Sequence, residues 1–209
     1  MKIAVVAANG KAGQLIVQEA IARGHEVTAV VRSANKTEAG NVLQKDLFDL
    51  TKEDLAGFDA VVSAFGVWSL DTFPQFTTSM EHLAGLLAGS DTRFLVVGGA
   101  GSLYVDPKMT TQLADTPDFP EEYKPLAQAM AKGLARLRSF SDTKWTFISP
   151  AADFVADGAR TGAYILAGEV FTTNEAGQSS ISYADYAIAM LDEIEKGSHI
   201  KERISVLGR

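Results

Sequence analysis

A seven-residue stretch near the N-terminus, Ala7-Ala8-Asn9-Gly10-Lys11-Ala12-Gly13, has the composition of a phosphate-binding turn. A pyrophosphate at a helix N-terminus needs backbone N–H groups that point at it, and small residues where backbone and phosphate meet. Ala7, Gly10 and Gly13 meet the second need, although glycine is commoner than alanine in the first place. The stretch follows the strand-like run Ile3-Ala4-Val5-Val6 and opens an amphipathic segment. We therefore predict that the pyrophosphate of a nicotinamide dinucleotide binds at Ala7, Asn9, Gly10, Lys11, Ala12 and Gly13.

The end of the second predicted strand, Val30-Val31-Arg32-Ser33, bears on the choice of nucleotide. About 20 residues after the turn, an NAD-specific protein usually offers an acid to the ribose 2′-hydroxyl. Arg32 stands there instead, and its guanidinium can pair bidentately with a 2′-phosphate, with Ser33 and Lys36 nearby. This arrangement favours NADP over NAD. The alternative is a solvated arginine that happens to follow a strand.

Asp46 and Leu47 follow the third predicted strand. The carboxylate of Asp46 and an adjacent backbone N–H suit the edge of an adenine ring. The alternative is that Asp46 caps a helix or a loop, which is a common use of aspartate.

The acid/base pair of alcohol dehydrogenation is missing. That reaction uses a tyrosine with a lysine four residues later on one helical face, where the ammonium lowers the pKa of the phenol. Of the five tyrosines only Tyr104 has such a lysine, Lys108, and Pro107 disfavours a helix between them. Tyr123 stands near a predicted helix start, but Ala127 is four residues on. Hydride transfer to a planar acceptor needs no such pair, because stacking of two rings supplies the geometry and water can supply the proton.

Residues in the predicted strand-end loops could wall a slot for a planar acceptor. They are Phe65, Trp68, Leu103, Tyr104 and Phe154. Ser102 or Tyr123 would be the hydroxyl partner of the acceptor, and these two residues are the catalytic candidates. Ser102 suits a hydrogen-bond donor better than a nucleophile, because no histidine neighbours it in a triad-like order. Ordinary core or lid packing is the alternative for Trp68 and Phe154.

The elements that would position these residues alternate regularly along the chain, as in βαβ units. The predicted strands are Lys2 to Ala7, Glu26 to Val31, Asn41 to Gln44, Ala60 to Ala64, Phe94 to Val97 and Trp145 to Ile148. The predicted helices are Lys11 to Arg23, Phe76 to Leu87 and Pro125 to Ser139. Most strands are short apolar runs, which is typical of a parallel sheet buried on both faces. We predict an α/β fold with a Rossmann-type doubly wound sheet, with ligands at the carboxyl ends of the strands.

Two regions break the alternation. The stretch from 98 to 123 has little periodicity and contains three prolines, and such a long loop usually serves function. From about residue 150, short strands are predicted over Thr161 to Leu166, Val170 to Thr172 and Ser179 to Ser182, then a helix over Ala184 to Lys196 and a strand over Arg203 to Leu207. We expect one domain over residues 1–209, in which residues 150–209 form a small cap on the substrate side.

Composition excludes several classes of protein. No run approaches the roughly 18 apolar residues of a membrane span, and the net charge of −7 disfavours nucleic acid as a partner. The strand-like run starts directly after Met1-Lys2, which leaves no room for a secretory signal, so we expect a cytoplasmic protein. The chain has no cysteine and three scattered histidines, so we expect no metal site. The sequence is compatible with either a monomer or a homodimer.

Several of these segments resemble the atypical short-chain dehydrogenase/reductase group. Within it the chain is similar to NADH-flavin reductases and to NAD(P)H-binding proteins related to biliverdin reductase B. The matching segments are residues 7–13, Arg32, Asp46-Leu47, Val62-Ser63-Ala64-Phe65-Gly66, Val96-Val97-Gly98-Gly99-Ala100-Gly101-Ser102-Leu103, Phe147-Ile148-Ser149-Pro150-Ala151-Ala152, Arg160-Thr161-Gly162-Ala163-Tyr164 and Ile181-Ser182-Tyr183-Ala184-Asp185-Tyr186. The resemblance therefore covers nearly the whole chain, and is more specific for fold and cofactor than for substrate.

The resemblance implies roles for residues that spacing alone does not assign. It implies that Phe65 and Gly66 pass along the dinucleotide, with Ala64 and Gly98 also at the cofactor. It implies that Ser102 lies beside the nicotinamide. It further implies that the backbone of Ser149, Pro150 and Ala151 fixes the carboxamide edge.

Three functions are consistent with these observations. The first is an NAD(P)H-dependent reductase that passes hydride from NADPH to FMN, FAD or another planar acceptor, such as a quinone or tetrapyrrole. The second is a non-catalytic regulatory protein that senses NADP. The third is an NAD-dependent epimerase or dehydratase, which would normally keep the Tyr/Lys pair and a larger domain. The missing pair and the resemblance favour the first.

Overall fold

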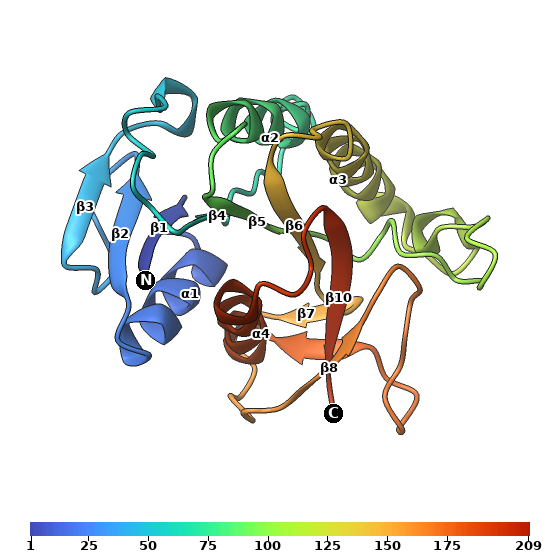
Figure 1. The fold of residues 1–209 in the computed structure, drawn as a ribbon. Coiled ribbons are helices and arrows are strands. Elements are labelled where there is room, and N and C mark those ends of the chain that lie inside the picture. The colour runs from blue at the N-terminus through green and yellow to red at the C-terminus, as the bar shows by residue number, and fades with distance from the viewer.

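Eight strands form the main sheet of the computed structural model, which describes all of residues 1–209. They are β1 (Lys2–Val6), β2 (Glu26–Val31), β3 (Asn41–Gln44), β4 (Ala60–Ser63), β5 (Arg93–Val97), β6 (Lys144–Ser149), β8 (Tyr164–Ala167) and β10 (Glu202–Gly208). Their order is β3-β2-β1-β4-β5-β6-β10-β8 (Figure 1). All neighbours pair in parallel except β8, which runs antiparallel to β10 at the edge. The predicted Rossmann-type doubly wound α/β fold is confirmed.

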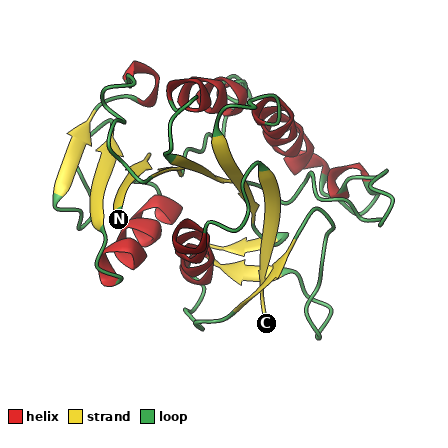
Figure 2. Cartoon of the chain, in the orientation of Figure 1, coloured by secondary structure: helices red, strands yellow, loops and turns green.

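Four helices cover the two faces of this sheet. They are α1 (Lys11–Ala22), α2 (Gln75–Leu86), α3 (Lys124–Leu137) and α4 (Tyr183–Lys196). Helices α1 and α4 lie together on one face, and α2 and α3 on the other (Figures 1 and 2). None of the four has the length and apolar character that a membrane crossing requires.

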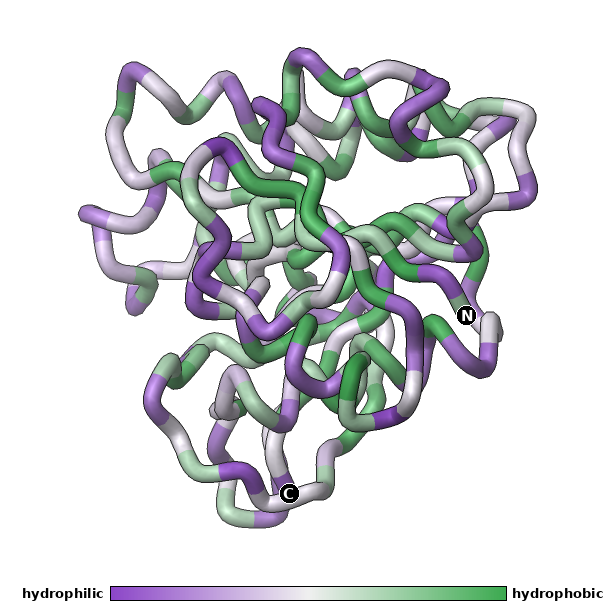
Figure 3. Tube along the Cα trace, turned by 90° about the vertical axis from the view of Figure 1, so that its left-hand side faces the viewer, coloured by the Kyte–Doolittle hydropathy of each residue, from purple (hydrophilic) through white to green (hydrophobic).

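The sheet separates two hydrophobic clusters. Ile3 and Val5 of β1 face the cluster under α1 and α4, whereas Ala4 and Val6 face the cluster under α2 and α3. Because both faces are buried, β1 is apolar at four consecutive positions, Ile3 to Val6, instead of at alternate ones. The same reason explains the fully buried β4. Along the Cα trace, hydrophobic segments run through the interior and hydrophilic ones gather at the outer turns (Figure 3).

The C-terminal part contributes to the fold in two ways. Strands β8 and β10 extend the main sheet, while β7 (Asp153–Val155) and β9 (Ser180–Ser182) pair with each other in a separate two-stranded sheet. The predicted strand over Val170 to Thr172 is wrong, because only Val170 makes an isolated bridge, to Tyr104. Strand β7 was not predicted. Strand β9 confirms the strand predicted over Ser179 to Ser182, whereas β7, with three residues, is too short for a hydrophobic period to identify it.

Candidate functional site

The turn between β1 and α1 leaves backbone donors free. No backbone carbonyl accepts a hydrogen bond from the N–H of Asn9, Lys11, Ala12 or Gly13, and no side chain caps this helix. The first turn of α1 also lacks an acidic residue. Helix α4 differs, because Ser182 caps it by accepting from the N–H of Asp185 at 3.0 Å. The α1 N-terminus thus combines free donors with the positive end of a helix dipole, which suits an anion such as a pyrophosphate.

The backbone of the turn explains its small residues. Ala7 adopts a φ of 60°, the left-handed region in which glycine is favoured, so alanine here takes the conformation of the usual glycine. At Gly13 a Cβ atom would lie 2.8 Å from the Ala7 carbonyl oxygen and 2.9 Å from the Ala8 Cα. Gly13 is therefore needed for the close packing of α1 against the end of β1.

Asn9 joins the turn to the loop after β2. Its Nδ2 donates to the Ala34 carbonyl oxygen at 2.9 Å, and its Oδ1 accepts from the Lys36 N–H at 2.8 Å. The same Nδ2 lies 3.3 Å from the Ser33 hydroxyl. Asn9 was predicted only as a cofactor contact, and this clamp on the second loop was missed because its partners lie 24 to 27 residues away.

Arg32 projects into solvent beside this loop. Its side chain is 79% exposed, and its Nε lies 3.9 Å from the Asp46 carboxylate. Asp46 in turn accepts from the Phe48 N–H at 3.0 Å and caps the short 3₁₀ turn Leu47–Asp49, which is the capping alternative considered for it. The turn, Arg32 and Asp46 thus lie at one end of the sheet. A phosphate that binds the Arg32 guanidinium would displace only a long, solvent-exposed ion pair, which contributes little to stability.

The carboxyl end of β4 lies beside the turn, at the same end of the sheet. The Ala64 N–H donates to the Val6 carbonyl oxygen at 3.0 Å, which keeps residues 64–66 beside the turn. Phe65 packs edge-on against Phe48 and Phe76, with ring centroids 6.4 and 6.2 Å apart. Trp68 follows in the loop and is 79% exposed, so it is not part of the core.

The ends of β5 and β6 form the next part of the edge. The N–H of Gly98 donates to the Ile148 carbonyl oxygen at 2.9 Å, and a Cβ at Gly98 would lie 2.2 Å from the Phe147 ring. Ser149 is fully buried and its hydroxyl has no hydrogen-bond partner. Pro150 and Ala151 are buried as well. The five predicted contacts at positions 64, 98, 149, 150 and 151 therefore lie at the carboxyl ends of adjacent strands.

Tyr186 of α4 contacts the carboxyl end of β6. No role was assigned to this residue from the sequence. Its hydroxyl donates to the Ile148 carbonyl oxygen at 2.7 Å, and the side chain is fully buried. Burial raises the pKa of Tyr186 well above that of a free phenol, so it stays neutral. Tyr186 thus positions the end of β6 and is no acid/base candidate.

The predicted acceptor residues occupy different surroundings. Phe154 stacks on Tyr183 with ring centroids 3.9 Å apart, which is the packing alternative considered for it. Leu103 is buried, and Tyr104 makes isolated bridges to Gln112 and Val170. Residues 105–108 form bends and turns, so Tyr104 and Lys108 share no helical face.

The two candidate hydroxyls also differ. Tyr123 is exposed and directly precedes α3. Ser102 is only 7% exposed, and its Oγ accepts a hydrogen bond from Arg203 Nη1 at 2.9 Å.

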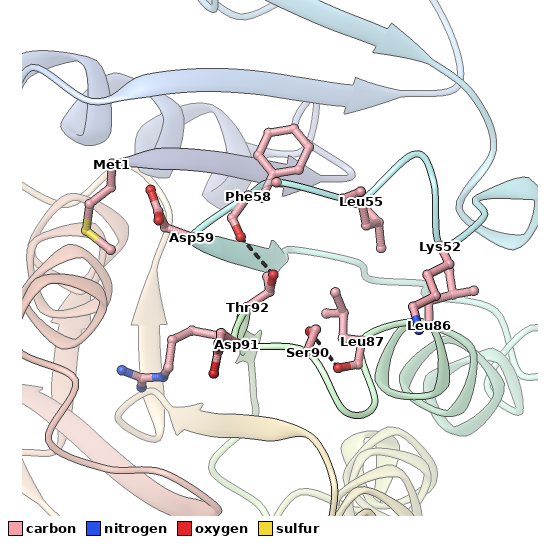
Figure 4. A pocket seen from close by; sticks show the side chains of 13 residues that line it. Met1, Lys52, Leu55, Phe58, Asp59, Leu86, Leu87, Ser90, Asp91 and Thr92 are labelled. Atoms are coloured by element: carbon pink, nitrogen blue, oxygen red, sulfur yellow. Dashed lines mark hydrogen bonds between the residues drawn. The ribbon is translucent and has the colours of Figure 1, made fainter.

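A surface hollow lies away from these residues. Its volume is about 620 Å³, and Met1, Asp59 and Thr92, which directly precede β1, β4 and β5, are among the residues around it (Figure 4). It therefore opens at the amino ends of the strands. In open α/β sheets ligands bind at the carboxyl ends of the strands, which is the end of this sheet where the free α1 N-terminus lies.

Several known proteins are similar to this chain. A family described as NAD(P)H-binding matches residues 7–196, from the first residue of the turn to the end of α4. The Bacillus subtilis protein YwnB is 48% identical over 209 residues, which are 99% of this chain and 98% of that protein. A Streptococcus pneumoniae crystal structure, described as "a putative NADH-flavin reductase", is 64% identical, covers 100% of both chains and superposes with a TM-score of 0.98.

A structure from Bacteroides thetaiotaomicron, described as "the putative epimerase", is 36% identical. It covers 99% of this chain and 96% of that one, with a TM-score of 0.86. The family match spans most of the chain, and two of these relatives share about half or more of its residues over their full length. This chain is a member of the NAD(P)H-binding family.

Proposed function

We propose that this protein is an NAD(P)H-dependent reductase that prefers NADPH and passes hydride to a flavin or another planar acceptor. The observation that carries the proposal is the uncapped α1 N-terminus beside the exposed guanidinium of Arg32. The first suits the pyrophosphate, and the second suits a 2′-phosphate. The 64% identical Streptococcus pneumoniae protein, described as an NADH-flavin reductase of putative function, supports a flavin as the acceptor.

The residues of this chain would act mainly by positioning. The free amides of residues 9 and 11–13 would bind the pyrophosphate, and the backbone at 149–151 would hold the carboxamide edge. The dihydronicotinamide would supply a hydride, which is two electrons with one proton, and the reduced acceptor would take its second proton from water. Trp68 and Tyr104 would face the acceptor, and Ser102 would donate a hydrogen bond to it. No residue has to change its protonation state in this scheme.

A titration with NADPH and NADH, followed by fluorescence, tests the cofactor part of the proposal. Loss of the dihydronicotinamide absorbance in the presence of FMN, FAD and quinones tests the reductase part. We expect tighter binding of NADPH and oxidation by at least one of these acceptors. Tight NADPH binding with no oxidation by any acceptor would contradict a reductase and favour the NADP-sensing alternative.

The epimerase alternative has one supporting observation, the 36% identical Bacteroides thetaiotaomicron protein. The missing acid/base pair weighs against it. Of the five tyrosines only Tyr104 has a lysine four residues on, and that pair lies in a turn-rich loop. Oxidation and re-reduction of a sugar carbon needs such a pair, so we favour the reductase.

A further inference from the structure

Arg203 is a charged side chain buried inside the protein, next to Ser102. It projects from β10, its side chain is 1% exposed, and it forms an ion pair with Glu169. Arg138 at the end of α3 pairs with the same carboxylate at 2.6 Å. Burial lowers the pKa of Arg203 and the Glu169 charge opposes that shift, so the guanidinium stays protonated. The result is a fixed positive charge within hydrogen-bond distance, 2.9 Å, of the Ser102 hydroxyl oxygen.

The direction of the bond between Arg203 and Ser102 is set by chemistry. A guanidinium has five N–H donors and no acceptor, so the Ser102 Oγ must accept from Arg203 Nη1. The Ser102 O–H proton therefore cannot point at Arg203. No carbonyl or carboxylate of the protein accepts from Ser102, since the Arg203 contact is its one side-chain hydrogen bond. A nearly buried hydroxyl is thus left with an unused donor.

A second buried arginine provides an internal comparison. Arg93 of β5 lies on the opposite face of the sheet, pairs with Glu193 of α4 at 2.8 Å and donates to the Thr146 hydroxyl at 2.8 Å. The Thr146 hydroxyl then donates to the His199 carbonyl oxygen. Both units contain an arginine, a glutamate and a hydroxyl, but only the unit around Arg93 uses its hydroxyl proton within the protein. The open donor at Ser102 is therefore not a general consequence of burying an arginine beside a hydroxyl.

We propose that Arg203 is a positioning residue, which fixes the Ser102 hydroxyl as a hydrogen-bond donor toward the planar acceptor. This inference rests on the proposed reductase function. When hydride moves to the acceptor, the electron pair leaves a negative charge that spreads onto an acceptor oxygen or nitrogen. The Ser102 O–H stabilises that atom by a hydrogen bond, and no proton leaves Ser102. The guanidinium strengthens the hydroxyl as a donor because positive charge lies on the far side of the oxygen.

A double-mutant cycle tests this role, with NADPH and FMN as the probes. The variants are Ser102→Ala, Arg203→Lys and the double variant, with Glu169→Gln as a second way to loosen the guanidinium if Arg203→Lys does not fold. We expect Ser102→Ala to lower kcat by about 10- to 100-fold, as for loss of one donor to a developing charge, with NADPH affinity within about twofold. Arg203→Lys lowers kcat by a smaller factor, and the double variant is no slower than Ser102→Ala alone. Ser102→Thr, which keeps the hydroxyl, restores most of the rate.

Arg93→Lys is the matched control for burial of a charge. It lowers the melting temperature but leaves kcat within about twofold, because Arg93 lies on the other face of the sheet. The infrared stretch of the FMN carbonyls adds a readout that a structural role would not move. It shifts to higher frequency in Ser102→Ala and in Arg203→Lys, but not in Arg93→Lys.

Two outcomes would overturn the inference. If the wild-type protein reduces FMN but the effects of Ser102→Ala and Arg203→Lys multiply, or the carbonyl stretch is unchanged, the positioning role fails while the reductase stands. If the wild-type protein binds NADPH but neither binds nor reduces FMN, FAD or a quinone, the proposed function fails and this inference fails with it.

Discussion

The two ends of the proposed ligand-binding edge are built in different ways. At the adenosine end, which we define as residues 7–13, 32–36 and 46, one neutral amide, Asn9, joins two of the segments through hydrogen bonds that span 24 to 27 residues. At the acceptor end, which comprises Trp68, residues 98–123 and residues 150–209, the contact between Ser102 and Arg203 spans 101 residues. The adenosine end can therefore form with the first three strands, whereas the acceptor end requires β10, the last strand along the chain.

Gly13 offers the strongest way to break the adenosine end alone. Gly13→Ala places a Cβ within 2.9 Å of backbone atoms of residues 7 and 8, which cannot move without parting α1 from β1. We expect NADPH binding to be lost and the free energy of unfolding to fall by about 1–3 kcal/mol, as for overpacking. Thermal unfolding and a fluorescence titration measure the two effects.

The control makes the same chemical change in a different helix. Gly85 lies in α2, and no atom lies within 4 Å of a Cβ added there. Gly85→Ala should raise the free energy of unfolding by up to about 1 kcal/mol and leave NADPH affinity unchanged. Equal stability of the two variants would contradict the tight packing at Gly13.

Arg32 tests whether the adenosine end selects the 2′-phosphate. Arg32→Ala removes an exposed guanidinium whose nearest carboxylate, Asp46, is 3.9 Å away. We expect NADPH to bind roughly 10- to 100-fold more weakly, as for loss of a charged hydrogen bond, and NADH to change by no more than about twofold. Arg136→Ala, which removes a surface arginine paired with Glu81, should change neither affinity. Equal losses for NADPH and NADH would remove Arg32 from the 2′-phosphate site.

Trp68 tests the acceptor end through its fluorescence. The chain has two tryptophans, of which Trp68 is exposed and Trp145 is buried. We expect FMN to quench the emission of Trp68, and Trp68→Ala to weaken FMN binding by about 2- to 10-fold, as for loss of one aromatic stacking partner. Trp145→Phe should keep the quenching. If Trp68→Ala still shows the full quenching by FMN, Trp68 does not contact the acceptor.

The smallest expected effect is a pH-dependent change in the loop fixed by Asp106, which the loop fixed by Asn9 should not show. At the acceptor end, Asp106 accepts from the backbone N–H groups of Thr111 at 2.9 Å and of Lys108 at 3.0 Å, and these bonds hold the pKa of Asp106 below its ordinary value. Because the pKa of Asp106 is lower in the folded than in the unfolded protein, its carboxylate stabilises the loop at pH values above about 3.9, the pKa of an unfolded aspartate. This stabilisation is lost as the pH falls through the pKa of Asp106 in the folded protein.

A pH titration followed by NMR measures this difference between the two loops. We expect the amide resonance of Thr111 to move as the pH falls below about 4, because its acceptor Asp106 becomes protonated. The amide of Lys36 should not move, because its acceptor is the neutral side chain of Asn9. Similar titration of both amides would show that the two loops are not held independently.

The elements around the adenosine end could be predicted closely from the sequence. The predicted β2 and β3 have the observed bounds, and the predicted α1 ends one residue late. This success has a physical cause, since a continuous apolar run and a small-residue turn before an amphipathic helix are local patterns. The role of Asn9 could not be predicted, because it depends on how the loop after β2 folds back over the turn.

The acceptor end was less predictable. The strand expected at Val170 to Thr172 is absent, β7 was missed, and Phe154 packs on Tyr183. No hydrophobic period marks the three residues of β7, and an aromatic residue in a loop has the same sequence signature whether it is packed or free. Tyr186 had no special signal either, because its hydroxyl meets the Ile148 carbonyl only when α4 lies beneath β6.

The α/β alternation, the parallel sheet and the position of the turn between β1 and α1 could all be predicted from the amino-acid sequence, because they depend on hydrophobic period and on residue size over short stretches. Which polar groups find a hydrogen-bond partner within the protein, and which remain free, depends on the tertiary fold. Ser102 and Thr146 are both hydroxyls beside a buried arginine, yet one keeps its proton available and the other does not. That difference depends on a third group brought from a distant strand or loop, which no local pattern encodes.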